Sequence, residues 1–188
     1  QKNKQLEEDF TDATKSKNTL GGVVEIRAYN VPVGLGSYVH YDRKLDGRIA
    51  QALMSIPSVK AVEIGNGIKS ASKRGSSVQD EIQYQNNRYV RSSNNAGGIE
   101  GGVSNGQEIV CRVFHKPIST IPSPLKTVDI ETKKETAALI ERSDICVVPR
   151  AGVVSEAMLA LTLADAFLEK FGADSLSELN KNFESYNA

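Results

Sequence analysis

The 188-residue sequence contains no tryptophan, and aromatic residues make up only 6% of it. Cysteine, methionine and histidine are equally scarce, at two residues each. These counts exclude a disulfide-rich scaffold, and no CxxC or mixed His/Cys cluster offers the ligands of a metal site. We interpret Cys111 and Cys146, each within an apolar run, as reduced and buried thiols. No bound metal is expected.

Net charge is also absent, because 23 Lys and Arg residues balance 23 Asp and Glu residues. A neutral chain has no field that favours nucleic acid or an acidic surface, so no nucleic-acid partner is expected. The longest apolar run is interrupted by Glu156, Thr162 and Asp165, which predicts no membrane span. The polar start QKNKQLEEDF lacks an initiating methionine and the features of a signal peptide, and it looks like the middle of a longer sequence. We expect a cytoplasmic protein.

The hydrophobic content of 39% and charged content of 24% are typical of a globular domain, and the first half shows clear periodicity. Residues 21–32 are predicted to form a strand, because β-branched side chains alternate there. Apolar side chains between 45 and 56 recur at helical spacing, and Pro57 ends the predicted helix. A short strand is expected at 59–65. From 68 to 95 polar residues dominate, which predicts a long mobile loop.

The next part of the chain is predicted to contain two hairpins and a further strand. Residues 97–103 and 108–114 are expected to pair with each other around the turn SNG. Residues 126–139 are expected to form a second hairpin that turns at Thr132 to Lys134. The run DICVVP is predicted to be another strand.

The last part of the chain is predicted to be helical. A long helix over 153–171 is stopped by Gly172, a usual residue after a helix C-terminus. Its polar stripe is narrow, which predicts a helix packed between two layers. A peripheral helix is expected at 175–188. These elements predict an α+β fold over residues 1–188, a β-α-β sandwich of antiparallel sheets with a long central helix.

The stretch NNAGGIEGGVSNG, residues 94–106, holds five glycines. It fits neither the G-x-G-x-x-G fingerprint nor the P-loop, because the glycine spacing is wrong and the chain has no Gly-Lys pair. Strand glycines otherwise mark a bulge or a close approach to the backbone. Two interpretations remain for the residues alone: close packing of another element, or a bare surface beside a large flat ligand.

Three further segments accompany this stretch: GLGSYVHYDRKLDGRIAQALMSIPSVKAVEIG, HKPISTIPSPL and ERSDICVVPRAGVVSEAMLALTLADA. In order and spacing, the four segments together resemble the C-terminal half of chorismate synthase, from about Gly21 to Ser175. The resemblance implies a 1,4-anti elimination of phosphate from 5-enolpyruvylshikimate 3-phosphate that gives chorismate, the last common step of aromatic amino acid biosynthesis. It also implies reduced FMN as the cofactor, a cytoplasmic enzyme and a homotetramer, and it leaves open whether NADPH reduces the flavin.

By resemblance, a set of residues taken from four motifs is expected to contact the flavin. These residues are Pro57, Ser58, Gly101, Lys116, Pro117, Ile118, Ser119, Thr120 and Arg142. Asp144 matches the aspartate that the family places near flavin N5 and is the candidate catalytic residue. The ordinary alternatives are a solvated Lys116, a salt bridge from Arg142 to Glu141 or Asp144, and a turn or cap role for Asp144.

The two histidines that the family uses as general acid and base belong to the other half of its sequence. His40 and His115 match neither of them, so we interpret both as structural or incidental. Two departures from the family pattern are Gln79, where many relatives carry histidine, and Arg150, where a small residue is usual. An interpretation from a different class is a non-catalytic fragment that carries the flavin platform or an oligomer contact. The isolated chain is expected to be inactive, because it needs the N-terminal half.

Overall fold

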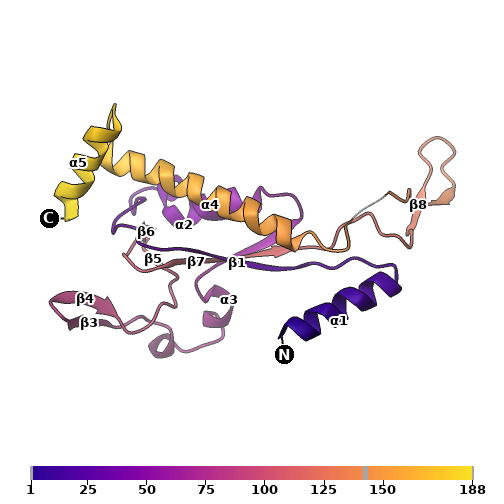
Figure 1. Cartoon of the computed structure of the whole chain (residues 1–188), viewed down its shortest axis with the longest axis horizontal. Coiled ribbons are helices and arrows are strands. Elements are labelled where there is room, and N and C mark those ends of the chain that lie inside the picture. The colour runs from indigo at the N-terminus through magenta and orange to yellow at the C-terminus, as the bar shows by residue number, and fades with distance from the viewer. Residues whose placement is uncertain (1, 142–143, 188) are drawn as a thin grey trace.

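The computed structural model describes residues 2–141 and 144–187 and has an elongated outline (Figure 1). Its helices are α1 (Lys2–Lys15), η1 (Tyr41–Arg43), α2 (Leu45–Met54), α3 (Gly67–Ser70), η2 (Gly75–Ser77), α4 (Val148–Phe171) and α5 (Leu176–Asn187). Its strands are β1 (Gly22–Ala28), β2 (Val59–Ile64), β3 (Ile82–Gln85), β4 (Arg88–Arg91), β5 (Ile99–Glu100), β6 (Val103–Ser104), β7 (Ile109–His115), β8 (Lys126–Val128) and β9 (Glu135–Ala137). Helices and antiparallel sheets together confirm the α+β class.

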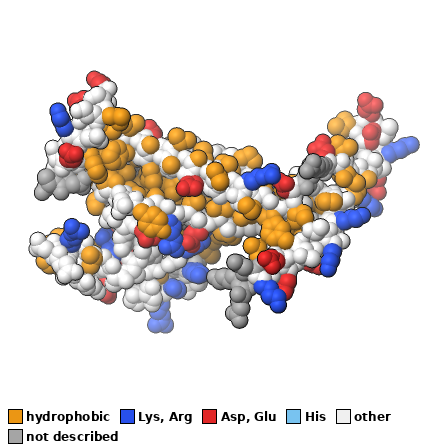
Figure 2. Space-filling model, in the orientation of Figure 1, with side chains coloured by type: hydrophobic (Ala, Val, Ile, Leu, Met, Phe, Trp, Pro, Cys, Tyr) orange, Lys and Arg blue, Asp and Glu red, His pale blue; other side chains and the backbone are white. Residues whose placement is uncertain are grey.

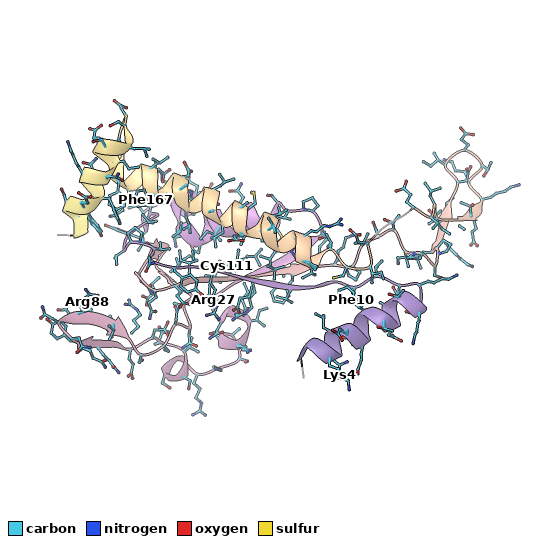
Figure 3. The ribbon with its side chains drawn as sticks, viewed as in Figure 1. Lys4, Phe10, Arg27, Arg88, Cys111 and Phe167 are labelled. Carbon is cyan, nitrogen blue, oxygen red and sulfur yellow. The ribbon has the colours of Figure 1, made fainter. Side chains whose placement is uncertain are left out.

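A three-stranded antiparallel sheet in the order β1-β7-β2 forms the centre of the molecule. β7 is its middle strand, and Val113 pairs with Val24 on one side and Val62 on the other. Cys111 and Val113 of β7 are fully buried in the core that this sheet shares with α2 and α4. Figure 3 labels Cys111 in the central sheet.

Helix α2 confirms the helix expected from the apolar spacing. Leu45, Ile49 and Leu53 recur every four residues, and each has 0% of its surface exposed. Side chains four apart lie on one face of a helix, and this face packs into the core. Met54 leaves that face and is 45% exposed.

Helix α4 begins at Val148, and the strand expected over DICVVP is therefore wrong. Within this run Cys146 forms an isolated parallel β-bridge with Leu20. Pro149 lies in the first turn of α4. Backbone N–H groups there have no intrahelical acceptor, so a proline in this turn breaks no helical hydrogen bond. Gly172 follows the last helical residue with φ 50°, as expected.

The expected pairing of residues 97–103 with 108–114 is also wrong. β5 pairs instead with β6 through a two-residue turn at Gly101 and Gly102. Both glycines have positive φ, 62° and 92°, which matches the twist that a tight hairpin needs. β7 is left free to pair on both edges as the central strand of the main sheet.

Residues 68–95 contain structure that their composition did not indicate. β3 and β4 form an exposed hairpin, in which the rings of Tyr84 and Tyr89 pack at a tilt with centroids 5.1 Å apart. The expected mobility of this segment stays a prediction. The hairpin expected over 126–139 is confirmed as β8–β9, and the Thr132 N–H donates to Asp129 in its turn.

The outer face of α4 is open in this chain. Val153 is 69% exposed and Leu161 66% exposed, and within residues 2–141 and 144–187 no second sheet covers this face. α5 confirms the expected peripheral helix and packs Phe183 against Phe167 and Phe171 of α4. Hydrophobic side chains gather where the two helices meet (Figure 2), around the labelled Phe167 (Figure 3).

α4 is long and apolar enough to cross a membrane, but core helices of globular proteins can have the same length and composition. The sequence argument from Glu156, Thr162 and Asp165 therefore does not exclude a span by itself. In the structure, the inner face of α4 packs on the central sheet and on α2, through Ala151 and Leu159 among others.

Candidate functional site

Two of the predicted flavin-binding motifs meet at one end of the central sheet. The backbone N–H of Lys116 donates to the carbonyl oxygen of Ser58, with 2.9 Å between nitrogen and oxygen. This contact follows from the register of the sheet, because His115 at the end of β7 pairs with Val59 at the start of β2. Motifs separated by more than fifty residues therefore share one backbone hydrogen bond.

Ser58 adopts a backbone conformation that is unusual for a residue with a side chain. Its φ is 73°, in the left-handed region, which costs an ordinary residue roughly 1–2 kcal/mol. The hydroxyl of Ser58 lies 2.9 Å from Nδ1 of His115, and this hydrogen bond holds the serine in place. Strained backbone of this kind clusters at functional sites.

His115 is almost completely buried, at 5% exposure, and burial lowers the pKa of its imidazole. Burial therefore favours the neutral form of the ring. Its Nε2 has no hydrogen-bond partner within the described part of the chain. Sequence reasoning left this histidine as structural or incidental, and its burial and its hydrogen bond with Ser58 agree with a structural role.

A third predicted segment reaches the same end of the sheet through residues 19 and 20. The Leu20 N–H donates to the carbonyl oxygen of Ile145 at 2.7 Å, directly after the candidate catalytic aspartate. The Thr19 hydroxyl donates to the carbonyl oxygen of Ile118 at 2.8 Å, within KPIST. Residues 19–20 thus join the segment around Asp144 to the third flavin motif.

Asp144 forms an ion pair with Arg150, and Oδ2 lies 2.5 Å from Nη1. Its side chain is 48% exposed, so the carboxylate stays in contact with solvent. Arg150 is the residue that departs from the family pattern. Arg142, the expected anion-binding arginine, lies outside the described residues.

The remaining members of the KPIST motif have mixed exposure. Lys116, Pro117 and Ser119 are exposed, whereas Ile118 and Thr120 are half-buried. Pro57, the residue before the strained serine, is exposed as well. An ammonium group and a hydroxyl therefore stand at the protein surface, where a ligand with negative charge can meet them.

Gly101 lies away from this cluster. The Leu45 N–H at the start of α2 donates to Gly102, the neighbour of Gly101, whereas Ser58 follows the end of α2. A ten-residue helix is about 15 Å long, so the structure does not bring Gly101 and Ser58 together. A side-chain carbon added at Gly101 would find no atom within 4 Å, so the backbone there is bare.

The glycine-rich stretch is held by Asp80, which sequence reasoning missed. Its carboxylate accepts hydrogen bonds from the Ser93 hydroxyl at 2.5 Å and from the backbone N–H groups of Asn95 and Ala96 at 2.8 and 2.9 Å. Burial raises the pKa of Asp80, but the hydrogen bonds outweigh burial and the net pKa is below its usual value. Nothing in the polar composition of 68–95 singled out this residue.

The bare backbone at Gly101 and the exposed ammonium of Lys116 fit different parts of a flavin nucleotide. A flat ring can lie on a glycine without meeting a side chain, and a cation suits a phosphate or an anionic ring. The unpaired Nε2 of His115 adds a polar atom at the Ser58 end. The donor set is therefore compatible with FMN, although its members lie at both ends of α2.

Comparisons with known proteins show which family this chain resembles. A family model described as chorismate synthase matches residues 1–168. The chain is 54% identical to chorismate synthase of Geobacter sulfurreducens over 93% of its own length and 46% of the relative's length. It is 55% identical to that of Aquifex aeolicus over 94% of its own length and 45% of the relative's length.

A solved structure titled "Crystal Structure of Chorismate Synthase" superposes with a TM-score of 0.81 at 44% sequence identity. The superposition covers 97% of this chain and 47% of that one. The chain therefore spans about half the length of the relatives it matches. A match of this extent to the family model and to its fold shows that the chain belongs to the chorismate synthase family.

Proposed function

We propose that the protein containing this chain eliminates phosphate from 5-enolpyruvylshikimate 3-phosphate in a 1,4-anti sense and yields chorismate. The observation that carries the proposal is the hydrogen bond between Lys116 and Ser58, which unites two motifs of the family at one surface. Family membership supports the reaction class, a lyase acting on a phosphate ester. The proposal concerns the whole protein, because this chain spans about half the length of its relatives.

The cofactor in this proposal is reduced FMN. When bound, reduced FMN would supply transient electron density for the departure of the allylic phosphate, with no net oxidation or reduction. The residues proposed to hold it are Pro57, Ser58, Gly101, Lys116, Pro117, Ile118, Ser119, Thr120 and Arg142.

Each of these groups has a definite role in the proposal. The Lys116 ammonium offsets negative charge on the flavin or the phosphate, and the Arg142 guanidinium grips an oxyanion with two parallel hydrogen bonds. Gly101 offers bare backbone to the ring. The hydrogen bond between Ser58 and His115 links the left-handed turn to the end of β7 and so helps to position the turn for the ligand.

Asp144 is the proposed proton-handling group of this chain. A carboxylate near flavin N5 can accept and return a proton at an Oδ atom. In the structure Oδ2 is engaged by Arg150, and the pair is exposed. Exposed ion pairs contribute little free energy, so a ligand can displace Arg150 at small cost.

We also propose a cytoplasmic homo-oligomer, a tetramer in the working form. The open apolar face of α4, with Val153 and Leu161 exposed, supports this proposal, because large exposed apolar patches mark interfaces. Analytical ultracentrifugation of the whole protein tests it. A strictly monomeric species at high protein concentration would argue against it.

The same open face favours a second candidate for the isolated chain, a non-catalytic flavin platform and oligomerisation fragment. The two functions are separated by one anaerobic assay of phosphate release, run with reduced FMN and 5-enolpyruvylshikimate 3-phosphate. The whole protein is expected to release phosphate and chorismate in equal amounts, and the 188-residue chain alone is expected to release none. Robust turnover by the chain alone would show that its own groups suffice.

A further inference from the structure

A polar cavity of about 340 Å³ lies where the loop before η1 meets the C-terminal end of α4. It contains none of the residues proposed to contact the flavin. At this end of the molecule α4 meets α5 (Figure 1). The cavity is lined by Gly34, Gly36, Ser37, Arg43, Ala166, Glu169 and Lys170.

Lys170 supplies an ammonium group whose position is fixed by an aromatic ring. Its Nζ lies 4.2 Å from the centroid of Tyr186, and the Tyr186 hydroxyl donates to the carbonyl oxygen of Val33 at 3.0 Å. A cation–π contact orients the charge but does not neutralise it. No carboxylate in the described chain pairs with Lys170, so its positive charge is uncompensated at the cavity wall.

Arg43 is the second cation of the cavity, and it too has no ion pair among the residues that the structure describes. The single carboxylate in the wall belongs to Glu169, which binds Nη1 of Arg48 at 2.7 Å. Arg48 also pairs with Asp165. Arg48 shares its single positive charge between the two carboxylates, so the charge of Glu169 is only partly compensated. With Arg43 and Lys170 against Glu169, the lining side chains still carry a net positive charge.

The glycines keep the cavity open beside these cations. A side-chain carbon at Gly34 would lie 3.1 Å from Nζ of Lys170, and φ at this residue is 82°. At Gly36, with φ 95°, such a carbon would lie 2.6 Å from the carbonyl oxygen of Gly102. The positive φ favours glycine at both positions, and at Gly36 the nearby backbone carbonyl requires it as well. At Gly34 the flexible end of Lys170 could move aside, but a side chain there would still take up space in the cavity.

We propose that this cavity binds the phosphate group of a small molecule. The Arg43 guanidinium can donate two parallel hydrogen bonds to phosphate oxygens, and the Lys170 ammonium adds a point charge. The Ser37 hydroxyl oxygen accepts from the Val39 N–H at 3.2 Å, so its O–H remains available to donate. The proposal rests on these groups alone and is independent of the proposed elimination reaction.

The test is a titration of the 188-residue chain with inorganic phosphate at constant ionic strength, followed by the amide resonances of residues 34–37. Saturable shifts are expected. Lys170→Gln is expected to weaken binding about tenfold, the effect of losing one charge-assisted hydrogen bond, and Arg43→Gln, which loses two, is expected to weaken it by more than about tenfold. Glu169→Gln removes a negative charge from the wall and is expected to tighten binding about threefold.

Lys126→Gln is the matched control, because it removes one positive charge from the β8–β9 hairpin, far from the cavity (Figure 1). It is expected to leave phosphate binding unchanged. Since Lys170 also packs on Tyr186, circular dichroism checks its fold, and the exposed Arg43 gives an independent variant. The proposal is overturned by shifts that do not saturate, by an equal loss in the control, or by succinate binding as tightly as phosphate.

Discussion

Nη1 of Arg150 lies 2.5 Å from Oδ2 of Asp144, so the candidate catalytic carboxylate is ion-paired by the one nearby residue that departs from the family pattern. The arginine side chain is 78% exposed and the aspartate 48%. Such a pair contributes at most about 1 kcal/mol to stability. Its consequence is therefore expected in catalysis, where Arg150 competes with the proposed ligand for the same oxygen.

Replacing Asp144 by asparagine in the whole protein is expected to slow the chemical step far more than it weakens flavin binding. The amide keeps the shape of the side chain but loses its charge and its ability to accept a proton. Single-turnover rates and anaerobic flavin titrations separate the two effects. Normal turnover of Asp144→Asn would return Asp144 to the role of a turn residue.

Arg150→Ala is the companion variant, and it is expected to leave the fold intact. Because the exposed pair contributes little, the free energy of unfolding should change by less than about 1 kcal/mol. The freed carboxylate should keep or raise the single-turnover rate. A large loss of stability would mean that the ion pair is a structural element at the start of α4.

Two glycines of the same stretch are predicted to respond differently to alanine. A side-chain carbon at Gly97 would lie 2.3 Å from the backbone nitrogen of Gly65, whereas at Gly101 it would meet no atom within 4 Å. Gly97→Ala should therefore cost about 1–3 kcal/mol from overpacking in addition to about 1–2 kcal/mol from the positive φ. Gly101→Ala should cost only the second amount and should also weaken flavin binding.

Urea denaturation and flavin titration of both variants check this contrast. Equal losses of stability would show that the backbone at Gly101 is packed in the assembled protein. Undiminished flavin affinity in Gly101→Ala would remove Gly101 from the proposed flavin surface.

The stability of the fold is predicted to fall as the pH drops below 6.5 because of His115. Burial lowers the pKa of the folded imidazole below its ordinary value of 6.5, so the unfolded chain binds the proton more readily. Stability from this group is fully present above pH 6.5 and is lost as the pH falls toward the folded pKa. Urea unfolding across pH 5–8 measures the slope, which His115→Gln should flatten.

His40→Gln serves as the control for the loss of one imidazole, since His40 is exposed. An unchanged slope in His115→Gln would contradict the burial argument.

Ser58→Ala should also lower the stability of the fold, because it removes the hydrogen-bond partner of His115 Nδ1 in an already strained turn.

The two thiols are predicted to differ sharply in reactivity. Burial raises the pKa of Cys111 to about 12, and the residue has 0% exposure in the central strand. Since the thiolate is the reactive form, Cys111 should resist alkylation until the protein unfolds. Cys146 is half-buried and should react first. Mass spectrometry after timed alkylation measures both, and fast labelling of Cys111 in the folded protein would contradict the buried placement.

Local patterns predicted the elements whose structure is decided locally. The four-residue spacing of Ile49 and Leu53 indicated α2, and Gly172 indicated the end of α4. The β8–β9 hairpin was likewise predicted from its own residues. In each of these elements the hydrogen bonds join residues that are close in sequence.

Long-range pairing was not predictable from local patterns. Val113 pairs with Val24 and Val62, so β7 is a central strand, and no local signal distinguishes such a strand from one arm of a hairpin. DICVVP looks like a strand by composition, but its last two residues, Val148 and Pro149, begin α4, because tertiary context overrides propensity.

In the candidate site, too, local patterns indicated some residues, whereas their contacts depend on long-range pairing. Resemblance named Ser58 and Lys116, but their shared hydrogen bond depends on the register between β2 and β7. The role of His115 depends on that register and on the left-handed turn at Ser58, which no local pattern indicated. The role of Asp80 could not be predicted from the sequence, because its three hydrogen-bond partners at residues 93–96 come next to it only in the folded chain.

Hydrogen–deuterium exchange of the whole protein, with and without reduced FMN under anaerobic conditions, tests the proposed flavin surface most directly. We predict protection of the peptides that contain residues 57–59, 99–103 and 116–120, because bound flavin would cover backbone amides at both ends of α2. The β8–β9 hairpin over 126–137 should exchange equally in both states. Tight binding of reduced FMN with no protection in any of the three peptides would contradict the account.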